Sequence, residues 1–299
     1  MVQDPSSALD TPWLSPGTLW PKVKQQTQLA LDCGALQPIN TTYEWVEDRN
    51  LRFLVRVLAN IQRKETAARD RPPNFNPFLP YEPELFVADL SPTHLVLLNK
   101  FNVMDHHILI VTREFASQDS LLGLADFQAL AIGLSEMDGL GFYNGGRIAG
   151  ASQQHKHLQI VPLPFVPDGS HLPLEPLMLE TAGINLKLPY RHAIAPLDAL
   201  DFTQPLTVAQ TLLEQYQALL SALNLIQTPA ATEPLGAYNL LVTRQWMCAV
   251  PRSQESFADI PVNSLGFTGA LLVKNQAQLD RLRELGPLAV LTAVGYAAR

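Results

Sequence analysis

The sequence predicts an α+β protein in which mainly antiparallel sheets are flanked by helices and two related halves follow one another. Short apolar runs typical of strands are interleaved with segments in which apolar residues recur every three to four positions. Short links join several of the strand-like runs, which indicates hairpins. A pair of such runs at 95–100 and 108–113 is echoed at 237–243 and 247–251, which supports two halves of related architecture.

The composition of the chain limits what it can bind. Of its 299 residues, 47% are hydrophobic and 16% are charged, against about 25% charged in an average soluble chain. Such a chain buries a large core and is not a disordered polymer. Its net charge of −7 argues against nucleic acid or an anionic membrane as partners. Small anionic ligands fit, because they need only a local positive pocket.

The cysteines and the N-terminus indicate the compartment. There are 2 cysteines and no C-x-x-C pair, which argues against a disulfide scaffold and a cysteine zinc site. Residues 1–16 lack the positive start and apolar run of a signal peptide. The mostly apolar run 288–298 is shorter than the roughly 18 residues that a membrane span needs. We therefore expect a cytoplasmic protein.

The first half begins with a predicted long amphipathic helix within 41–64. Apolar residues there, among them Tyr43, Val46 and Leu54, follow a spacing of three to four. The proline-rich segment 71–84 is expected to be a loop, because its prolines disfavour helix. The rest of this half is predicted to contain strands at 85–88, 94–98, 108–112, 141–144 and 157–161 and a helix at 126–137.

The second half is predicted to contain a helix at 206–223, followed by the paired strands 237–243 and 247–251. A boundary between the halves is expected near residues 165–200, beside a loose proline-containing stretch. We place it at residue 190, which gives an N-terminal domain of residues 1–190 and a C-terminal domain of residues 191–299.

The stretch NGGRIAGASQQHKHLQIVPLP at 144–164 is the most informative part of the sequence. On a strand, the period of two places His155, His157 and Gln159 on one face. One interpretation is a solvated strand face. A second is a metal site in which the two histidines share an ion, although an obvious third ligand is missing. A third interpretation is a catalytic site.

The approach to this strand favours the catalytic interpretation. A loop of small residues leads directly into His155, namely Gly145, Gly146, Gly150, Ala151 and Ser152. Such a loop lets backbone N–H groups come close to phosphate oxygens. A neutral imidazole at its end can attack phosphorus, and the resulting phosphoramidate is discharged by a second acceptor.

The run HKHLQ at 155–159, followed by IVP, resembles the H-x-H-x-Q strand of the histidine-triad transferases. The stretches 97–115, 144–159, 238–253 and 263–274 are similar to recurrent blocks of the ATP adenylyltransferases, also called diadenosine tetraphosphate (Ap4A) phosphorylases. The resemblance covers about residues 40–299. It implies a histidine-triad-like fold and the reversible reaction of Ap4A with phosphate to ADP and ATP through an adenylyl-histidine intermediate.

The same resemblance implies roles for individual residues. His157 would attack the α-phosphorus, Gln159 would hydrogen-bond the phosphate or the leaving oxygen, and His155 would orient a partner. The implied nucleotide contacts are Lys64, Asn99, Lys100, Asn144, Gly150, Ala151, Ser152, Gln153, Asn263, Ser264, Leu265, Ala270 and Lys274. The three lysines are equally open to interpretation as surface or helix-end charges, and Asn263 with Ser264 as a helix cap.

Other expectations complete this picture. We expect the remaining histidines, which are His94, His106, His107, His171 and His192, to be structural. Mg²⁺ or another divalent ion is expected to accompany the polyphosphate and not to occupy a protein cage. The expected partners are small nucleotides (Ap4A, ATP, ADP) and phosphate, and the expected oligomeric state is a monomer.

A nucleotide-binding regulator that keeps the pocket without turnover is one alternative that remains open, and two further alternatives are enzymes. One is a uridylyltransferase acting on a sugar phosphate, against which Lys156 counts, because those enzymes usually have proline there. The absence of evident cysteine metal ligands also counts against it. The other is a metal-dependent hydrolase with His155 and His157 as ligands.

Overall fold

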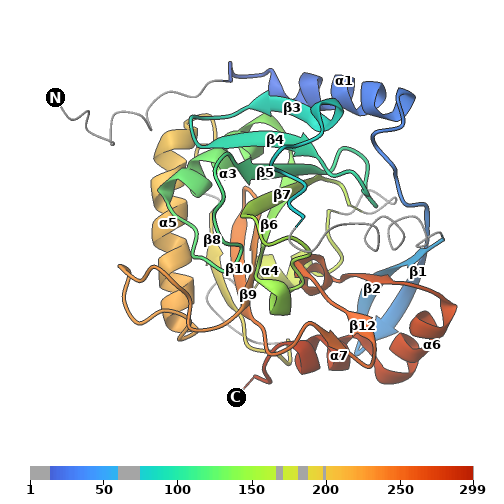
Figure 1. The fold of residues 1–299 in the computed structure, drawn as a ribbon. Helices are drawn as coiled ribbons and strands as arrows, with labels where there is room; N and C mark the ends of the chain where they lie inside the picture. The colour runs from blue at the N-terminus through green and yellow to red at the C-terminus, as the bar shows by residue number, and fades with distance from the viewer. Residues whose placement is uncertain (1–13, 60–74, 166–170, 181–187, 198–199, 299) are drawn as a thin grey trace.

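The computed structural model in Figure 1 describes residues 14–59, 75–165, 171–180, 188–197 and 200–298. Within these residues an eight-stranded sheet forms the middle of the molecule, in the order β3-β4-β5-β7-β6-β9-β10-β8, with every pair of neighbours antiparallel. Its strands are β3 (Phe86–Asp89), β4 (His94–Leu98), β5 (Ile108–Thr112), β6 (Gly139–Gly145), β7 (His157–Pro162), β8 (Ala193–Pro196), β9 (Tyr238–Val242) and β10 (Trp246–Pro251).

Three helices cover one face of this sheet. They are α1 (Leu19–Asp32), α3 (Leu124–Glu136) and α5 (Pro205–Ala222), and they share one apolar core with the strands. Figure 1 shows α5 alongside the sheet and α1 across its β3 end. Leu158 and Ile160 of β7 are completely buried in this core. Because strand side chains alternate, the residues between them face the other side of the sheet.

The other side carries a smaller three-stranded sheet and the C-terminal helices. In the smaller sheet β1 (Thr41–Asp48) pairs antiparallel with β2 (Leu51–Leu58), and β13 (Ala270–Val273) pairs parallel with β2. The remaining elements are α4 (Glu175–Glu180), α6 (Gln276–Leu285), α7 (Pro287–Val294), β11 (Ser256–Phe257), β12 (Ile260–Pro261) and the 3₁₀ turns η2 (Pro83–Leu85), η3 (Arg147–Ala149) and η4 (Ser264–Thr268). Figure 1 shows β1 and β2 beside α6 and α7, so early and late segments of the chain meet here.

The predicted helix within 41–64 is wrong for its described part, which folds as the β1–β2 hairpin. Arg49 and Asn50 join the strands with φ angles of 49° and 63°, the left-handed conformation that a two-residue type I′ turn requires. Both arms are rich in β-branched and aromatic residues, which favour strands. The apolar residues that suggested a helix lie in two strands on either side of the turn, and Phe53, Leu54 and Val55 of β2 are all completely buried. Residues 60–64 lie outside the described part of the chain.

The other predicted helices and strands are confirmed, with ends shifted by at most two residues. The segments on either side of residue 190 share both sheets, because β6 pairs with β9 and β2 pairs with β13. The domain boundary at residue 190 stays a prediction. None of the described helices is long and apolar enough to cross a membrane.

Candidate active site

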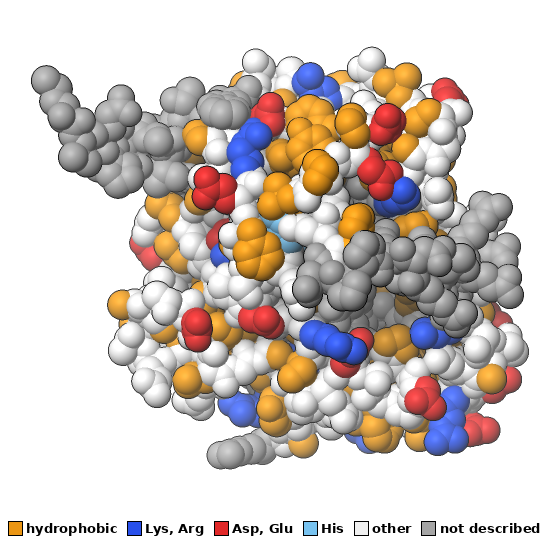
Figure 2. All heavy atoms as spheres, viewed as in Figure 1, with side chains coloured by type: hydrophobic (Ala, Val, Ile, Leu, Met, Phe, Trp, Pro, Cys, Tyr) orange, Lys and Arg blue, Asp and Glu red, His pale blue; other side chains and the backbone are white. Residues whose placement is uncertain are grey.

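A cavity of about 380 Å³ opens on the sheet face opposite α3 and α5. His157 and Gln159 of β7 line it, as do Phe142 and Asn144 of the neighbouring β6. The predicted alternation therefore holds for His157 and Gln159, which line one cavity, whereas His155 precedes β7 and is not among the residues that line it. In Figure 2 a histidine is visible in a hollow near the middle of the molecule, between apolar side chains.

The imidazole of His157 is buried, fixed and neutral. Its Nδ1 lies 2.8 Å from the carbonyl oxygen of His155, which only accepts, so Nδ1 carries the proton and Nε2 keeps its lone pair. Burial lowers the pKa of His157 to about 4, so the ring is uncharged at neutral pH. A buried glutamine, Gln118, also holds the backbone of this residue. Its Oε1 accepts from the His157 N–H at 2.8 Å, and its Nε2 donates to the His157 carbonyl at 3.2 Å.

His155 precedes β7, and its backbone forms an isolated bridge with Ser117. Its Nε2 lies 2.8 Å from the Thr112 carbonyl oxygen and 2.9 Å from the hydroxyl of the same residue. Its Nδ1 accepts from the amide of Asn76 at 2.9 Å. Burial lowers the pKa of His155 as well. With both ring nitrogens engaged, His155 fits an orienting role.

This geometry does not suit a metal ion shared by the two histidines. Both nitrogens of His155 already have partners, and Nδ1 of His157 is held by a carbonyl. Across the described ranges, no group of three or more histidine, cysteine, aspartate or glutamate side chains could hold a metal. The hydrolase alternative therefore lacks its ligand set in this part of the chain.

Gln159 has a partner that the sequence did not indicate. Its Oε1 lies 3.1 Å from Nε2 of His107, and Nδ1 of His107 lies 3.1 Å from the amide nitrogen of Asn99. All three residues line the cavity. His107 was expected to be structural, but it lies in the cavity, where it contacts a proposed site residue.

The loop between β6 and β7 is shaped by two glycines with left-handed backbone. Gly146 has a φ of 87° and Gly150 a φ of 92°, on either side of η3. A Cβ on Gly150 would lie 2.9 Å from the carbonyl oxygen of Val262, so glycine lets this loop approach the segment before η4. Of the loop residues implied by the resemblance, Gly150, Ser152 and Gln153 line the cavity. Ala151 is not among the residues that line it; its N–H donates to the Gly146 carbonyl at 3.1 Å.

Asn144 is held by residues from the second half of the chain. Its Oδ1 accepts from the Ser264 N–H at 3.0 Å, from the Ser264 hydroxyl at 2.7 Å and from Nδ2 of Asn239 at 2.9 Å. Arg252 in turn donates to Oδ1 of Asn239 at 2.7 Å. Since Oδ1 is saturated, the Asn144 amide N–H group is the end left for the cavity. Ser264 is completely buried and does not line the cavity; it contributes to the site through its hydrogen bonds to Asn144.

Asn239 is a further residue that the sequence analysis missed. The available signal was an asparagine within the apolar strand YNLLV, because a polar residue buried in a central strand needs a partner. Asn263, Leu265 and Ala270, which the resemblance implied, do line the cavity.

Of the described residues, two with cationic side chains line the cavity, and they differ in their surroundings. Nζ of Lys100 is paired with Glu82 at 2.7 Å. For Arg56 of β2, the described residues supply a hydrogen bond from Nη1 to the Thr41 hydroxyl at 3.3 Å but no partner for the buried Nε. Burial lowers the pKa of the Arg56 guanidinium. Lys274, after β13, is exposed and does not line the cavity, and Lys64 lies outside the described residues.

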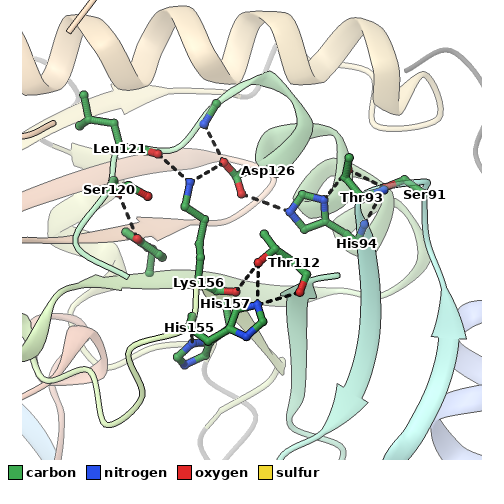
Figure 3. A network of polar contacts seen from close by, with 12 residues as sticks. Ser91, Thr93, His94, Thr112, Ser120, Leu121, Asp126, His155, Lys156 and His157 are labelled. Carbon is green, nitrogen blue, oxygen red and sulfur yellow. Dashed lines mark hydrogen bonds and ion pairs between the residues drawn. The ribbon is translucent and has the colours of Figure 1, made fainter. Parts of the chain in front are cut away.

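A buried charged network supports the active strand from the helix side (Figure 3). The Lys156 side chain points away from the two imidazoles, and its Nζ contacts Oδ2 of Asp126 at 3.2 Å and the Leu121 carbonyl at 2.8 Å. Asp126 also contacts Nε2 of His94 at 3.1 Å and the N–H of Gly123 at 2.7 Å. Burial alone would raise the pKa of Asp126, but His94 and Lys156 hold it below its ordinary value. The network thus ties the strand to the start of α3.

Comparisons with known proteins identify the family and the fold of this chain. A family model for the Ap4A phosphorylase N-terminal domain matches residues 10–180, more than half of the chain, and one for the ATP adenylyltransferase C-terminal domain matches residues 186–297. The chain belongs to the Ap4A phosphorylase family. Among curated relatives, diadenosine 5',5'''-P1,P4-tetraphosphate phosphorylase 2 of Saccharomyces cerevisiae is 33% identical over 70% of this chain and 72% of its own. Protein APA1 of the same yeast is 30% identical over 68% of both chains.

Solved structures of this family share the fold. The crystal structure of yeast Ap4A phosphorylase Apa2 in complex with Ap4A superposes with a TM-score of 0.75 at 25% identity, covering 95% of this chain and 99% of that one. The complex of Apa2 with AMP gives a TM-score of 0.72 at 26% identity over the same shares. The expected α+β, histidine-triad-like fold is confirmed.

Proposed function

We propose that this Ap4A phosphorylase family member catalyses the reversible reaction of Ap4A with phosphate to ADP and ATP. The observation that carries the proposal is the state of His157. Its ring is neutral, its Nδ1–H is held by a carbonyl oxygen, and the residue lines the cavity of about 380 Å³. The relatives named for this reaction, and the Apa2 complexes with Ap4A and AMP, supply the substrate class.

The proposed reaction proceeds in two displacements on one phosphorus. The Nε2 lone pair of His157 attacks the α-phosphorus of one adenylate. The bond from that phosphorus to the bridging oxygen breaks, and ATP leaves with the electron pair. An oxygen of inorganic phosphate then attacks the adenylyl phosphorus, the P–N bond breaks, ADP leaves and neutral His157 is restored.

Gln159, Asn144 and the glycine loop fit the stabilisation of this phosphorus centre. The amide of Gln159 donates hydrogen bonds but cannot act as an acid, and ATP needs no proton to leave. The Asn144 amide N–H group and the loop at Gly150 and Ser152 offer further donors to phosphate oxygens. The role of each of these residues is part of the proposal.

The polyphosphate also needs positive charge. Among the described residues Arg56 forms no direct ion pair, although the charge of Asp105 acts on its guanidinium; it lines the cavity, so it fits a phosphate group. The described cavity residues offer one carboxylate, Glu82, and it is paired with Lys100. They do not form a cage for Mg²⁺, so the divalent ion is proposed to arrive with the polyphosphate oxygens, and no step depends on it.

The setting of the enzyme is also proposed. Cys33 and Cys248 are free thiols, which fits a reducing cytoplasmic compartment. A monomer suffices, because the strands of both halves join in one sheet and both halves contribute residues to one cavity.

Nucleotide chromatography tests the function directly. Ap4A is incubated with the protein and Mg²⁺, with and without phosphate, and the products are separated. We expect ADP and ATP only when phosphate is present. Formation of AMP and ATP without phosphate would identify a hydrolase, and no consumption of Ap4A would overturn the proposal.

A further inference from the structure

We propose that His107 is a positioning residue that fixes the amide of Gln159 so that its N–H₂ group, and not its oxygen, faces the transferred phosphoryl group. This inference rests on the proposed function. It assigns a role to a buried histidine that the two-displacement reaction itself does not use.

The hydrogen bonds around His107 determine its tautomer. The amide nitrogen of Asn99, 3.1 Å from Nδ1 of His107, carries only hydrogens, so Nδ1 must accept. A neutral imidazole that accepts at Nδ1 carries its proton at Nε2. That N–H lies 3.1 Å from Oε1 of Gln159 and donates to it. The two hydrogen bonds therefore point the same way: Asn99 donates to His107, and His107 donates to Gln159. We call this chain of three residues the relay.

The relay decides which end of the Gln159 amide is available. The terminal torsion of glutamine is broad and roughly two-fold, so oxygen and nitrogen could exchange places without help. Nε2–H of His107 favours the orientation with Oε1 toward the ring, which leaves the amide N–H₂ group for the cavity. The reversed amide would place two donors together at His107 and would present an oxygen to the anionic phosphate, where two acceptors repel.

Packing and the backbone keep the relay in place. Gln159 lies opposite Leu109 in the β5–β7 ladder, two residues beyond His107. The N–H of Asn99 donates to the carbonyl of His107 at 2.9 Å, so these two residues are also joined through the backbone. The His107 ring packs against Phe142 with centroids 5.8 Å apart, and 8% of the residue is exposed. The ring is thus held in position before substrate arrives.

A double-mutant cycle tests this role through kinetics of Ap4A phosphorolysis at saturating phosphate. The variants are His107→Phe, which keeps a planar ring without nitrogens, Gln159→Ala and their combination. We expect His107→Phe to lower kcat about tenfold, roughly what one hydrogen bond is worth, with KM for Ap4A within about twofold of the wild type. In the Gln159→Ala background, His107→Phe should add no further loss, because its only route to the reaction is gone.

The conservative variant His107→Gln provides rescue, because its amide nitrogen can occupy the place of Nε2 and donate to Gln159. We expect it to recover most of the lost kcat. Losses that multiply in the double variant, or a rise in KM with unchanged kcat in His107→Phe, would overturn the positioning role. Equal thermal unfolding midpoints show that each variant is folded.

Imidazole ¹⁵N chemical shifts of the free wild-type protein test the relay without turnover. We expect His107 to be the neutral tautomer protonated at Nε2. Protonation at Nδ1 would overturn the inference, even if every variant failed to fold. Wild-type protein that does not consume Ap4A at all would instead overturn the proposed function, so the two failures are distinguishable.

Discussion

The side chain of Gln118 brackets the backbone of His157, accepting from its N–H at 2.8 Å and donating to its carbonyl at 3.2 Å. The same Nε2 donates to the Asn144 carbonyl at 2.9 Å, so one amide joins β6 and β7 at the nucleophile. Gln118 is 1% exposed, so these backbone groups depend on its amide and not on bulk solvent for their hydrogen bonds.

We therefore expect Gln118→Ala to act on both stability and rate. Loss of the amide leaves buried backbone groups unpaired, which should lower the free energy of unfolding by about 2–3 kcal/mol. Because the His157 ring is then less constrained, kcat should fall at least about tenfold. Urea unfolding and steady-state kinetics measure the two effects. Gln217→Ala, at a partly exposed site on α5, is the matched control, and wild-type kcat in Gln118→Ala would refute the positioning effect.

The nucleophile is tested by His157→Ala. We expect turnover to be abolished, because no other described side chain of the cavity supplies an equivalent free lone pair, whereas AMP binding should largely survive. Isothermal titration measures the binding, and labelling with α-³²P-ADP, from which phosphate leaves, detects the adenylyl-enzyme in the wild type only. An alanine variant that keeps wild-type rates, or that still takes up label, would show that another residue attacks.

Burial of His157 also makes stability depend on pH. The unfolded ring takes up a proton near its ordinary pKa of 6.5, whereas the native ring does so only near 4. Between these values the unfolded state binds more protons, so the free energy of unfolding falls as the pH falls from 6.5 to 4, by about 3 kcal/mol for this one group.

Urea unfolding between pH 4.5 and 7 measures this dependence. His157→Leu should flatten the slope, because leucine contributes no proton uptake on unfolding. His155 and His192, whose pKa values burial also lowers, keep a slope of the same sign in the variant. An identical slope in wild type and variant would mean that the native His157 ring titrates like an exposed histidine.

The alternation in HKHLQ was sufficient to predict a shared face for His157 and Gln159, because strand geometry is local. The partners of these residues were not predictable, because they come from distant parts of the chain. Gln118 lies 39 residues from His157, and His107 lies 52 residues from Gln159. Only the tertiary arrangement of β5, β6 and β7 places them together.

The hairpin at 41–58 shows a different limit of prediction from local sequence. Its apolar spacing fits a helix when the turn is overlooked, and Arg49 with Asn50 is a weaker turn signal than an Asn-Gly pair. Pairing of β2 with β13, more than 200 residues later in the chain, completes the smaller sheet. That pairing overrides the local pattern, and no local window contains it.

The network behind the active strand predicts a stability effect of Lys156→Met. Methionine fills similar volume but leaves the buried Asp126 carboxylate without its cationic partner, which should cost about 3 kcal/mol of unfolding free energy. Adding Asp126→Asn removes the uncompensated charge, so the double variant should be more stable than Lys156→Met alone. Lys24→Met, at an exposed position of α1, is the control. A double variant less stable than either single one would mean that the Asp126 charge is not what Lys156 balances.

Arg56 is expected to contribute affinity for phosphate groups and little stability. Its guanidinium is partly desolvated, and its buried Nε has no partner among the described residues, so Arg56→Met relieves a desolvation cost while removing the cation. We expect the unfolding midpoint to stay within a few degrees of wild type. KM for Ap4A or for phosphate should rise about tenfold, because a charge-assisted hydrogen bond to phosphate is lost.

Varying Ap4A at saturating phosphate, and phosphate at saturating Ap4A, shows which substrate Arg56 binds. Arg56→Lys should retain part of the affinity. Arg283→Gln is the control, because Arg283 pairs with Glu44 and Asp280 at the surface and does not line the cavity. If Arg56→Met leaves both KM values unchanged, Arg56 contributes to the wall of the cavity and not to phosphate binding. The positive charge for the polyphosphate must then come from elsewhere in the chain.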